Sequence, residues 1–325
     1  MRELVIAGYG VSVRARRGLL LITSREGRRE VSPADLDAVI VATGGVSISS
    51  KAVRLLMSHG VDLVFLDSRG RPLGRVYPPF INRTVATRRA QYAAYNTWRR
   101  WEVVAALVEA KLRNQANLLR YYAKSRGLRE LRDCAAEVLD ALEGLPAALG
   151  NARAVLNVEA RAARAYWSGV ALLLPAELGF DGRDPDSPDP MNVCLNYAYA
   201  LLYSQCWRAL TLAGLDPYAG FLHADRSGKE SLVYDYSDQF KPPAVDRLLI
   251  RAFSSGWRPG VERGLLTPGS RGELVKMFLE WLGRRVRPST GQPCTLRQAV
   301  RRWAFRLAAF LRGDERAYRG FVEPW

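Results

Sequence analysis

The sequence predicts an α+β protein, in which a small β-sandwich-like domain with one helix precedes a larger, mainly α-helical domain. Residues 1–80 contain short runs of Val, Ile and Leu separated by glycine, a pattern typical of strands and turns. From residue 81 to 325, Ala, Leu and Arg recur at helical spacing instead. The proline-containing segment 78–83 separates the two patterns, and we place the domain boundary at residue 80.

Within the first domain, strands are expected where β-branched and aliphatic residues cluster between turn residues. The predicted strands are residues 3–7, 19–23, 38–42, 61–66 and 73–77. One helix interrupts them, because Ser49 or Ser50 can cap an apolar run at residues 52–57 and Gly60 provides a C-terminal stop.

The second domain is predicted to be helical along most of its length. Its first helical region runs from Tyr92 to Tyr122, where aromatic and aliphatic residues recur at helical spacing. Further helices are predicted at residues 130–142, 152–174, 192–213, 234–253, 271–281 and 296–311.

The composition excludes several classes of protein. With 325 residues, of which 48% are hydrophobic and 25% charged, the chain can bury a core and is not of the disordered type. Its apolar runs are far shorter than the ~20 residues of a membrane helix, and its N-terminus lacks a signal pattern, so we expect a soluble, cytoplasmic protein without a membrane partner. The four cysteines form no C-x-x-C pair, which disfavours a zinc finger or a disulfide scaffold.

The chain is strongly basic, with 48 basic against 32 acidic residues and a formal net charge of +16. Such an excess favours a polyanionic partner, nucleic acid before an anionic membrane. Of the basic residues 42 are Arg, whose planar fork suits phosphate, although a GC-rich genome would produce the same bias. Ten Arg lie between residues 284 and 319, in a stretch that is either a solvated helix face or a surface that follows a phosphate backbone.

Three features could carry chemistry, and the first is Glu159. Its carboxylate falls on an apolar helical stripe with Val155 and Ala162. Because a buried charge is costly unless it is compensated, Glu159 either pairs with an inward Arg161 or Arg164 or belongs to a site.

The second feature is His223, at the end of the apolar, turn-rich segment 214–223, where it is either a ligand or a satisfied core histidine. The third is the pair Asp235 and Asp238, which share one face of a helical turn and could instead match the helix dipole. Taken together, Glu, His and Asp side chains form a mixed donor set that suits Mg²⁺ or Mn²⁺ and leaves positions for water and a phosphate. On a basic chain, such a site predicts phosphodiester chemistry on nucleic acid. The alternative is a non-catalytic nucleic-acid-binding scaffold, in which these residues are structural.

Longer motifs give the sequence a family resemblance over nearly its whole length. They are residues 156–167, 189–203, 214–223 and 235–240 in the helical domain, and 45–50 and 64–67 with Gly70 and Pro72 in the β-domain. On these motifs the sequence resembles the CRISPR-associated protein 1 family, the integrase of CRISPR adaptation. The resemblance implies an N-terminal β-domain joined to a helical catalytic domain, with the β-domains pairing into a homodimer.

The resemblance also implies a site and an activity. Glu159, His223 and Asp238 would bind the Mg²⁺ or Mn²⁺, and Asp235 would be an auxiliary catalytic acid beside them. Members of this family join CRISPR-associated protein 2 and insert short foreign DNA into the CRISPR array, by attack of a DNA 3′-hydroxyl on a phosphodiester. A metal-dependent DNA endonuclease activity is implied as well, on DNA that is double-stranded, branched or carries 3′ overhangs.

Overall fold

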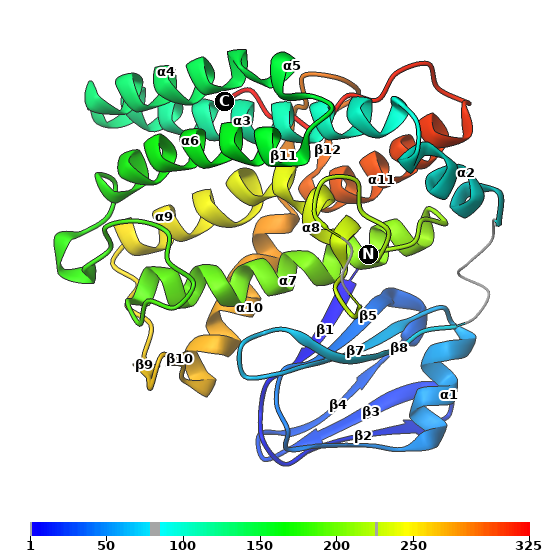
Figure 1. The fold of residues 1–325 in the computed structure, drawn as a ribbon. Coiled ribbons are helices and arrows are strands. Elements are labelled where there is room, and N and C mark those ends of the chain that lie inside the picture. The colour runs from blue at the N-terminus through cyan, green and yellow to red at the C-terminus, as the bar shows by residue number, and fades with distance from the viewer. Residues whose placement is uncertain (1, 79–84, 225–226) are drawn as a thin grey trace.

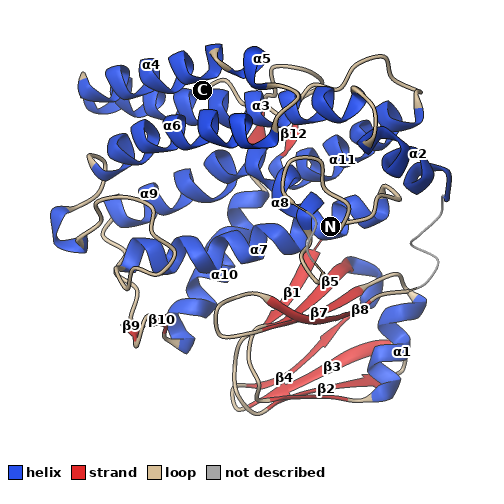
Figure 2. Ribbon diagram, viewed as in Figure 1, coloured by secondary structure: helices blue, strands red, loops and turns tan. Residues whose placement is uncertain are grey.

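The computed structural model describes residues 2–78, 85–224 and 227–325. Figures 1 and 2 show a strand-rich N-terminal part beside a larger helical part, so the predicted α+β class, with the β-domain first, is confirmed. The predicted boundary at residue 80 lies within 79–84, outside the described residues.

The β-domain contains two four-stranded sheets that share one apolar core. Its strands are β1 (Arg2–Ile6), β2 (Val11–Arg16), β3 (Leu19–Ser24), β4 (Gly27–Val31), β5 (Leu36–Val41), β6 (Val46–Ile48), β7 (Asp62–Leu66) and β8 (Pro72–Val76). The first sheet has the order β1-β5-β7-β8, with β8 antiparallel to its neighbour, and the second has the order β4-β3-β2-β6. The 3₁₀ turn η1 (Pro33–Asp35) precedes β5.

The packing of β5 explains why residues 38–42 are apolar without a break. Val39 and Val41 face the core shared by the two sheets, whereas Ile40 and Ala42 belong to the core of the helical part. Alternate residues of a strand point to opposite faces, so a strand that is buried on both faces reads as a continuous apolar run. One face of the first sheet therefore packs against the helices.

In the β-domain, the sequence prediction misses three strands, β2, β4 and β6. Along β2, apolar or small residues alternate with Ser and Arg, because one face of the strand lies in the core. Charged residues fill β4, which is the edge of its sheet and largely exposed. Strand β6 has three residues, too few for a periodic pattern.

Helix α1 (Ser50–Ser58) covers one end of the β-domain and begins where the sequence predicts. The Ser49 hydroxyl accepts the N–H of Ala52 at 3.2 Å, and the helix ends at His59, next to Gly60. The helical part then contains α2 (Val85–Tyr95), α3 (Arg99–Arg126), α4 (Glu130–Glu143), α5 (Leu145–Ala148), α6 (Ala152–Ala171), η3 (Ala176–Leu178), α7 (Pro190–Leu212), α8 (Ser231–Ser237), the 3₁₀ turn η4 (Asp238–Phe240), the π-helical turn η5 (Pro242–Asp246), α9 (Arg247–Ser254), α10 (Pro268–Leu282) and α11 (Leu296–Arg312). Two short strand pairs complete it, β9 (Val261–Glu262) with β10 (Leu265–Leu266) and β11 (Arg285–Val286) with β12 (Cys294–Thr295).

The single helix predicted over residues 234–253 is wrong. The chain there divides into α8, η4, η5 and α9. Pro242 and Pro243 have no N–H to donate, so a regular α-helical hydrogen-bond ladder cannot pass through them. Asp235 and Asp238 consequently lie on two short consecutive elements rather than on one long helix.

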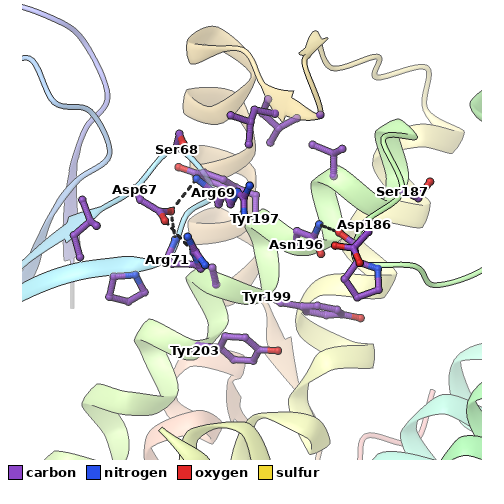
Figure 3. Close-up of a pocket in the computed structure, with 18 of the residues that line it drawn as sticks. Asp67, Ser68, Arg69, Arg71, Asp186, Ser187, Asn196, Tyr197, Tyr199 and Tyr203 are labelled. Carbon is purple, nitrogen blue, oxygen red and sulfur yellow. Dashed lines mark hydrogen bonds and ion pairs between the residues drawn. The ribbon is translucent and has the colours of Figure 1, made fainter. Parts of the chain in front are cut away.

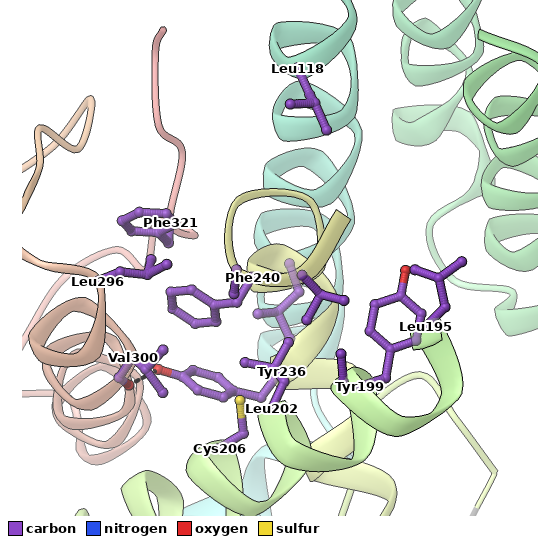
Figure 4. Close-up of a cluster of buried hydrophobic side chains, with 14 of the residues drawn as sticks. Leu118, Leu195, Tyr199, Leu202, Cys206, Tyr236, Phe240, Leu296, Val300 and Phe321 are labelled. Carbon is purple, nitrogen blue, oxygen red and sulfur yellow. Dashed lines mark hydrogen bonds between the residues drawn. The ribbon is translucent and has the colours of Figure 1, made fainter. Parts of the chain in front are cut away.

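This broken segment is held by the core of the helical part. In Figure 4, Tyr236 and Phe240 lie among apolar side chains of α7 and α11, including Leu202, Cys206 and Val300. The Tyr236 hydroxyl donates to the Val300 carbonyl at 2.5 Å, so the polar end of this buried ring is satisfied. The turn that carries the two aspartates is therefore fixed from the inside of the domain.

Two expectations from the composition can be compared with the structure. All four cysteines are free thiols, and three of them are buried. In the described part of the chain, none of the helices combines the length and the apolar content that a bilayer crossing requires.

Candidate functional site

Glu159 reaches the site from α6. The helix begins at Asn151, whose side chain accepts two N–H groups of the first turn at 3.0 and 3.2 Å. The helical neighbours of Glu159 on the same stripe, Val155 and Ala162, are fully buried core residues, and the Glu159 side chain itself is only 8% exposed. A carboxylate thus lies at the inner face of the helix, as the sequence predicts.

His223 is held in place by Asp235 of α8. Oδ1 of Asp235 lies 2.5 Å from Nδ1 of the imidazole, and the same carboxylate accepts the N–H groups of Phe221, Leu222 and His223 at 2.6, 3.0 and 3.1 Å. With a carboxylate as acceptor, the neutral ring keeps its proton on Nδ1 and leaves a lone pair on Nε2. The hydrogen bond to Asp235 raises the pKa of His223 above its ordinary value, although burial opposes this.

Gly220 allows the histidine loop to approach α8 this closely. A Cβ at this position would lie 2.7 Å from Cβ of Ser231 and 3.0 Å from Oδ2 of Asp235. A larger residue would therefore separate His223 from the carboxylate that orients it.

Asp238, at the start of η4, faces two lysines instead of the histidine loop. Nζ of Lys111, on α3, lies 2.7 Å from Oδ2 of Asp238 and 2.8 Å from Oε1 of Glu159, and Nζ of Lys241 lies 2.5 Å from Oδ1 of Asp238. Burial alone would raise the pKa of Asp238, but the two ammonium groups outweigh burial and hold this pKa well below its usual range. The two Asp carboxylates of the predicted pair thus have different partners.

The structure brings all four predicted residues, Glu159, His223, Asp235 and Asp238, to the wall of one small cavity. Its volume of about 10 Å³ is close to the space that a single water-sized group needs. His223 is not a core histidine, because its side chain is 28% exposed. These residues are distant in the sequence, and the structure brings them together, as the hypothesis of a shared site requires.

The charge partner of Glu159 is a lysine, not the Arg161 or Arg164 that one of the two sequence-based interpretations offered. Glu159 pairs with Lys111, whereas Arg161 pairs with Asp140 on α4. Sequence reasoning missed both Lys111 and Lys241. The sequence could have drawn attention to them, because six of its 48 basic residues are Lys. Each Lys therefore departs from the arginine bias of the chain.

The donor chemistry fits Mg²⁺ or Mn²⁺. Two carboxylates supply oxygen ligands, and the imidazole is oriented through its other nitrogen by a carboxylate, as is usual for metal-binding histidine. Among the described residues, however, no three His, Cys, Asp or Glu side chains are placed to bind one ion. Lys111 lies between Glu159 and Asp238 and contacts both carboxylates. Binding of a metal by the predicted ligands thus requires Lys111 to move.

A larger pocket, of about 930 Å³, borders the site. Figure 3 shows it between the turn that joins β7 to β8, the aromatic face of α7 and the loop that precedes α7. The rings of Tyr203 and Tyr234 in its wall have centroids 5.0 Å apart, and the Tyr234 centroid lies 6.3 Å from that of His223. The lining includes Arg69, Arg71, Arg183 and Arg263. Tyr234 in the wall of this pocket is therefore a neighbour of the histidine.

The arginine-rich stretch from residue 284 to 319 is partly structural. Arg284 forms a two-pronged ion pair with Glu323, at 2.6 and 2.5 Å, and Arg297 reaches Glu3 at 3.2 Å. These side chains tie the C-terminal tail and the β-domain to the helices, so they contribute to the fold rather than to a phosphate-binding surface.

The C-terminal tail also braces the turn that carries Asp238. Asn114 of α3 donates to the carbonyls of Gln239 and Phe321 at 2.7 Å each, and accepts the N–H of Glu323 at 2.9 Å. The Gln239 side chain accepts the N–H of Phe321 at 2.6 Å. No sequence pattern indicated this network, because its members are brought together by tertiary packing alone.

Residues 4–278 match the family model described as CRISPR associated protein Cas1, and the chain belongs to this family, as its motifs indicated.

Full-length relatives support this assignment. The CRISPR-associated endonuclease Cas1 2 of Saccharolobus solfataricus is 39% identical over 322 residues, which are 99% of this chain and 98% of the relative. The CRISPR-associated endonuclease Cas1 of Hyperthermus butylicus is 40% identical over 326 residues, 98% of each chain. Among solved structures, a casposase bound to its integration product is similar with a TM-score of 0.86 and 26% identity, over 98% of this chain and 93% of the casposase.

Proposed function

We propose that this chain joins and cuts DNA at the site formed by Glu159, His223 and Asp238, with Mg²⁺ or Mn²⁺ as the cofactor. As a member of the Cas1 family, the chain is an endonuclease and integrase of CRISPR adaptation, which inserts short foreign DNA into the CRISPR array. The observation that carries the site assignment is the Asp235–His223 pair, which lines one cavity with Glu159 and Asp238.

The residues of the site have separate tasks in this proposal. When bound, a divalent cation would polarise a phosphoryl oxygen and lower the pKa of an attacking 3′-hydroxyl or water. Glu159 and Asp238 supply oxygen donors, and Asp235 fixes the ring of His223 so that Nε2 is available as a nitrogen donor. Lys241, 2.5 Å from Asp238, offsets part of the negative charge that the carboxylates bring together.

DNA, in this proposal, approaches through the pocket shown in Figure 3. Arg69 and Arg183 offer guanidinium groups to phosphates, while Tyr203 and Tyr234 offer ring faces on which bases of an unpaired end can stack. The net charge of +16 supports a polyanionic substrate of this kind. Such a route suits 3′ overhangs, whose ends are single-stranded, and branched DNA that has an unpaired arm.

The proposal includes a homodimer formed through the β-domains and association with CRISPR-associated protein 2, in the cytoplasm. Strand β8 is an edge of its sheet, and its Leu73 and Val76 are 73% and 37% exposed. An exposed edge with apolar side chains is typical of a strand that pairs with another chain. The free cysteines support a reducing compartment.

The test is a strand-transfer and cleavage assay on labelled branched DNA with Mn²⁺, Mg²⁺ or a chelator. His223→Ala should abolish product formation in a folded protein that still binds DNA. His59→Ala is the matched control, because His59 is the other histidine of the chain and lies exposed at the end of α1 in the β-domain.

The same assay separates an enzyme from a nucleic-acid-binding scaffold. An enzyme loses product in the chelator while DNA binding largely persists. Product that survives both the chelator and His223→Ala would refute the metal site. DNA binding without product, in the presence of the CRISPR-associated protein 2 partner, would favour the scaffold.

A further inference from the structure

Lys111 stands where the proposed metal ion would bind. Its Nζ donates to Oε1 of Glu159 at 2.8 Å and to Oδ2 of Asp238 at 2.7 Å. The ammonium group of Lys111, on α3, thus contacts carboxylates from two other elements, α6 and η4. A divalent cation bound by the same two carboxylates would need the space that this ammonium group fills.

The residue type supports such a position. The chain uses 42 Arg and six Lys, yet it has Lys at this point. An ammonium is a compact point charge on a flexible four-carbon stem, whereas a guanidinium is a broad planar fork. Between two carboxylates, Lys is therefore the side chain that most resembles a small cation and that can most easily withdraw.

The surroundings of Lys111 also allow it to leave. Its side chain is 18% exposed, about twice as much as those of Glu159 and Asp238, at 8% and 9%. Its ammonium group contacts one carboxylate oxygen of Glu159 and one of Asp238. The ammonium thus compensates two nearly buried carboxylates and still has contact with solvent.

We propose that Lys111 is a built-in counter-cation, which occupies the metal position in the metal-free protein and is displaced when Mg²⁺ or Mn²⁺ binds. This inference rests on the proposed function, because it assumes that Glu159, His223 and Asp238 are the metal ligands. It has two consequences. Lys111 stabilises the metal-free protein, and it weakens the apparent affinity for the metal.

The test is calorimetric titration of the full chain with Mn²⁺ in the absence of DNA. If Lys111 occupies the site about 90% of the time, Lys111→Met should bind Mn²⁺ about 10-fold more tightly than the parent. In a chelator, the same variant should melt at a lower temperature than the parent, and saturating Mn²⁺ should restore most of this loss.

Two control variants separate displacement from general electrostatics. Lys241 lies closer to Asp238 than Lys111 does, at 2.5 Å, but it is not the lysine that bridges Glu159 and Asp238. Lys241→Met therefore measures the effect of removing a nearby charge. Lys124→Met, at an exposed position on the same helix, should leave Mn²⁺ affinity unchanged. If Lys111→Met binds Mn²⁺ no more tightly than Lys241→Met, the displacement proposal is wrong.

Amine-selective acetylation followed by mass spectrometry gives a second readout that needs no variant. Saturating Mg²⁺ should increase the labelling rate of Lys111 and leave that of Lys124 unchanged. Labelling of Lys111 that does not respond to Mg²⁺ would overturn the proposal.

Failure of this inference differs from failure of the proposed function. If the parent binds Mn²⁺ and His223→Ala abolishes that binding, while Lys111→Met binds no more tightly, the counter-cation role alone is rejected. If neither the parent nor Lys111→Met binds Mn²⁺ at millimolar concentration, the metal site itself is rejected, and the inference with it.

Discussion

Asp235 binds both the ring and the backbone of His223. Its Oδ1 lies 2.5 Å from Nδ1 of the imidazole and 3.1 Å from the His223 N–H, while Oδ2 accepts from Phe221 and Leu222. One buried carboxylate thus sets the path of the loop and the orientation of the ring at the same time. Asp238, three residues later, has no part in this arrangement and instead contacts the two lysines.

Asp235→Asn should weaken Mn²⁺ binding and strand transfer by about 10–100-fold, because the amide cannot accept at both former oxygen positions and the ring loses its charged partner. Calorimetry and the DNA assay measure the two effects. Asp216→Asn is the control in the same loop. The Asp216 carboxylate accepts hydrogen bonds from the Tyr92 hydroxyl and the Tyr218 backbone N–H. Parental Mn²⁺ affinity in Asp235→Asn would contradict the positioning role.

Asn114→Ala should lower the free energy of unfolding by about 3 kcal/mol, because it removes three hydrogen bonds and leaves buried backbone groups of Gln239, Phe321 and Glu323 without a partner. Chemical denaturation measures this loss. Asn117→Ala, on the same helix, removes one hydrogen bond to the Glu323 carbonyl and should cost about 1 kcal/mol. Equal losses in the two variants would show that the C-terminal tail is not clamped through Asn114.

Gly320→Ala should loosen the C-terminal tail. A Cβ at this position would lie 2.5 Å from Cβ of Ala110 and would also collide with the carbonyl oxygen of Ala106, so the tail must move away from α3 at a cost of about 1–3 kcal/mol. Limited proteolysis should cut the tail of this variant faster than that of the parent. At Gly269 a Cβ meets open space, and Gly269→Ala should be resistant to the protease like the parent.

The raised pKa of Asp246 predicts that the stability of the protein depends on pH. Burial raises the pKa of this carboxyl group above its ordinary value, although the hydroxyls of Tyr166 and Tyr199, both at 2.6 Å, oppose this shift. The folded state therefore keeps the proton to a higher pH than the unfolded state does. The stability that Asp246 contributes in this way is fully present below about pH 4, the ordinary pKa of Asp. It is lost as the pH rises through the raised pKa.

Asp246→Asn should remove this dependence, because the amide does not titrate. The stability of the parent relative to the variant should fall between pH 4 and neutral pH, as measured by denaturation at each pH. A difference in stability that grows as the pH rises would contradict the sign of the shift.

Local patterns were sufficient for much of the fold. Ser49 and Gly60 mark the ends of α1, and the apolar run at residues 38–42 predicts most of β5. Strands whose residues do not alternate in an apolar pattern, such as the charged edge β4, were missed because exposure removes the signal. The sequence analysis missed the break between α8 and α9, although Pro242 and Pro243 indicate it.

By itself, the sequence singled out the candidate donors of the site, because a carboxylate on an apolar stripe, as at Glu159, is anomalous wherever its helix packs. Only the tertiary structure decided what compensates that carboxylate. Lys111 is 48 residues from Glu159 and 127 from Asp238, and the packing of α3 against α6 and η4 brings its ammonium between them. Spacing along a chain reports the faces of single helices and strands, whereas the neighbours of a buried charge depend on how those elements pack together.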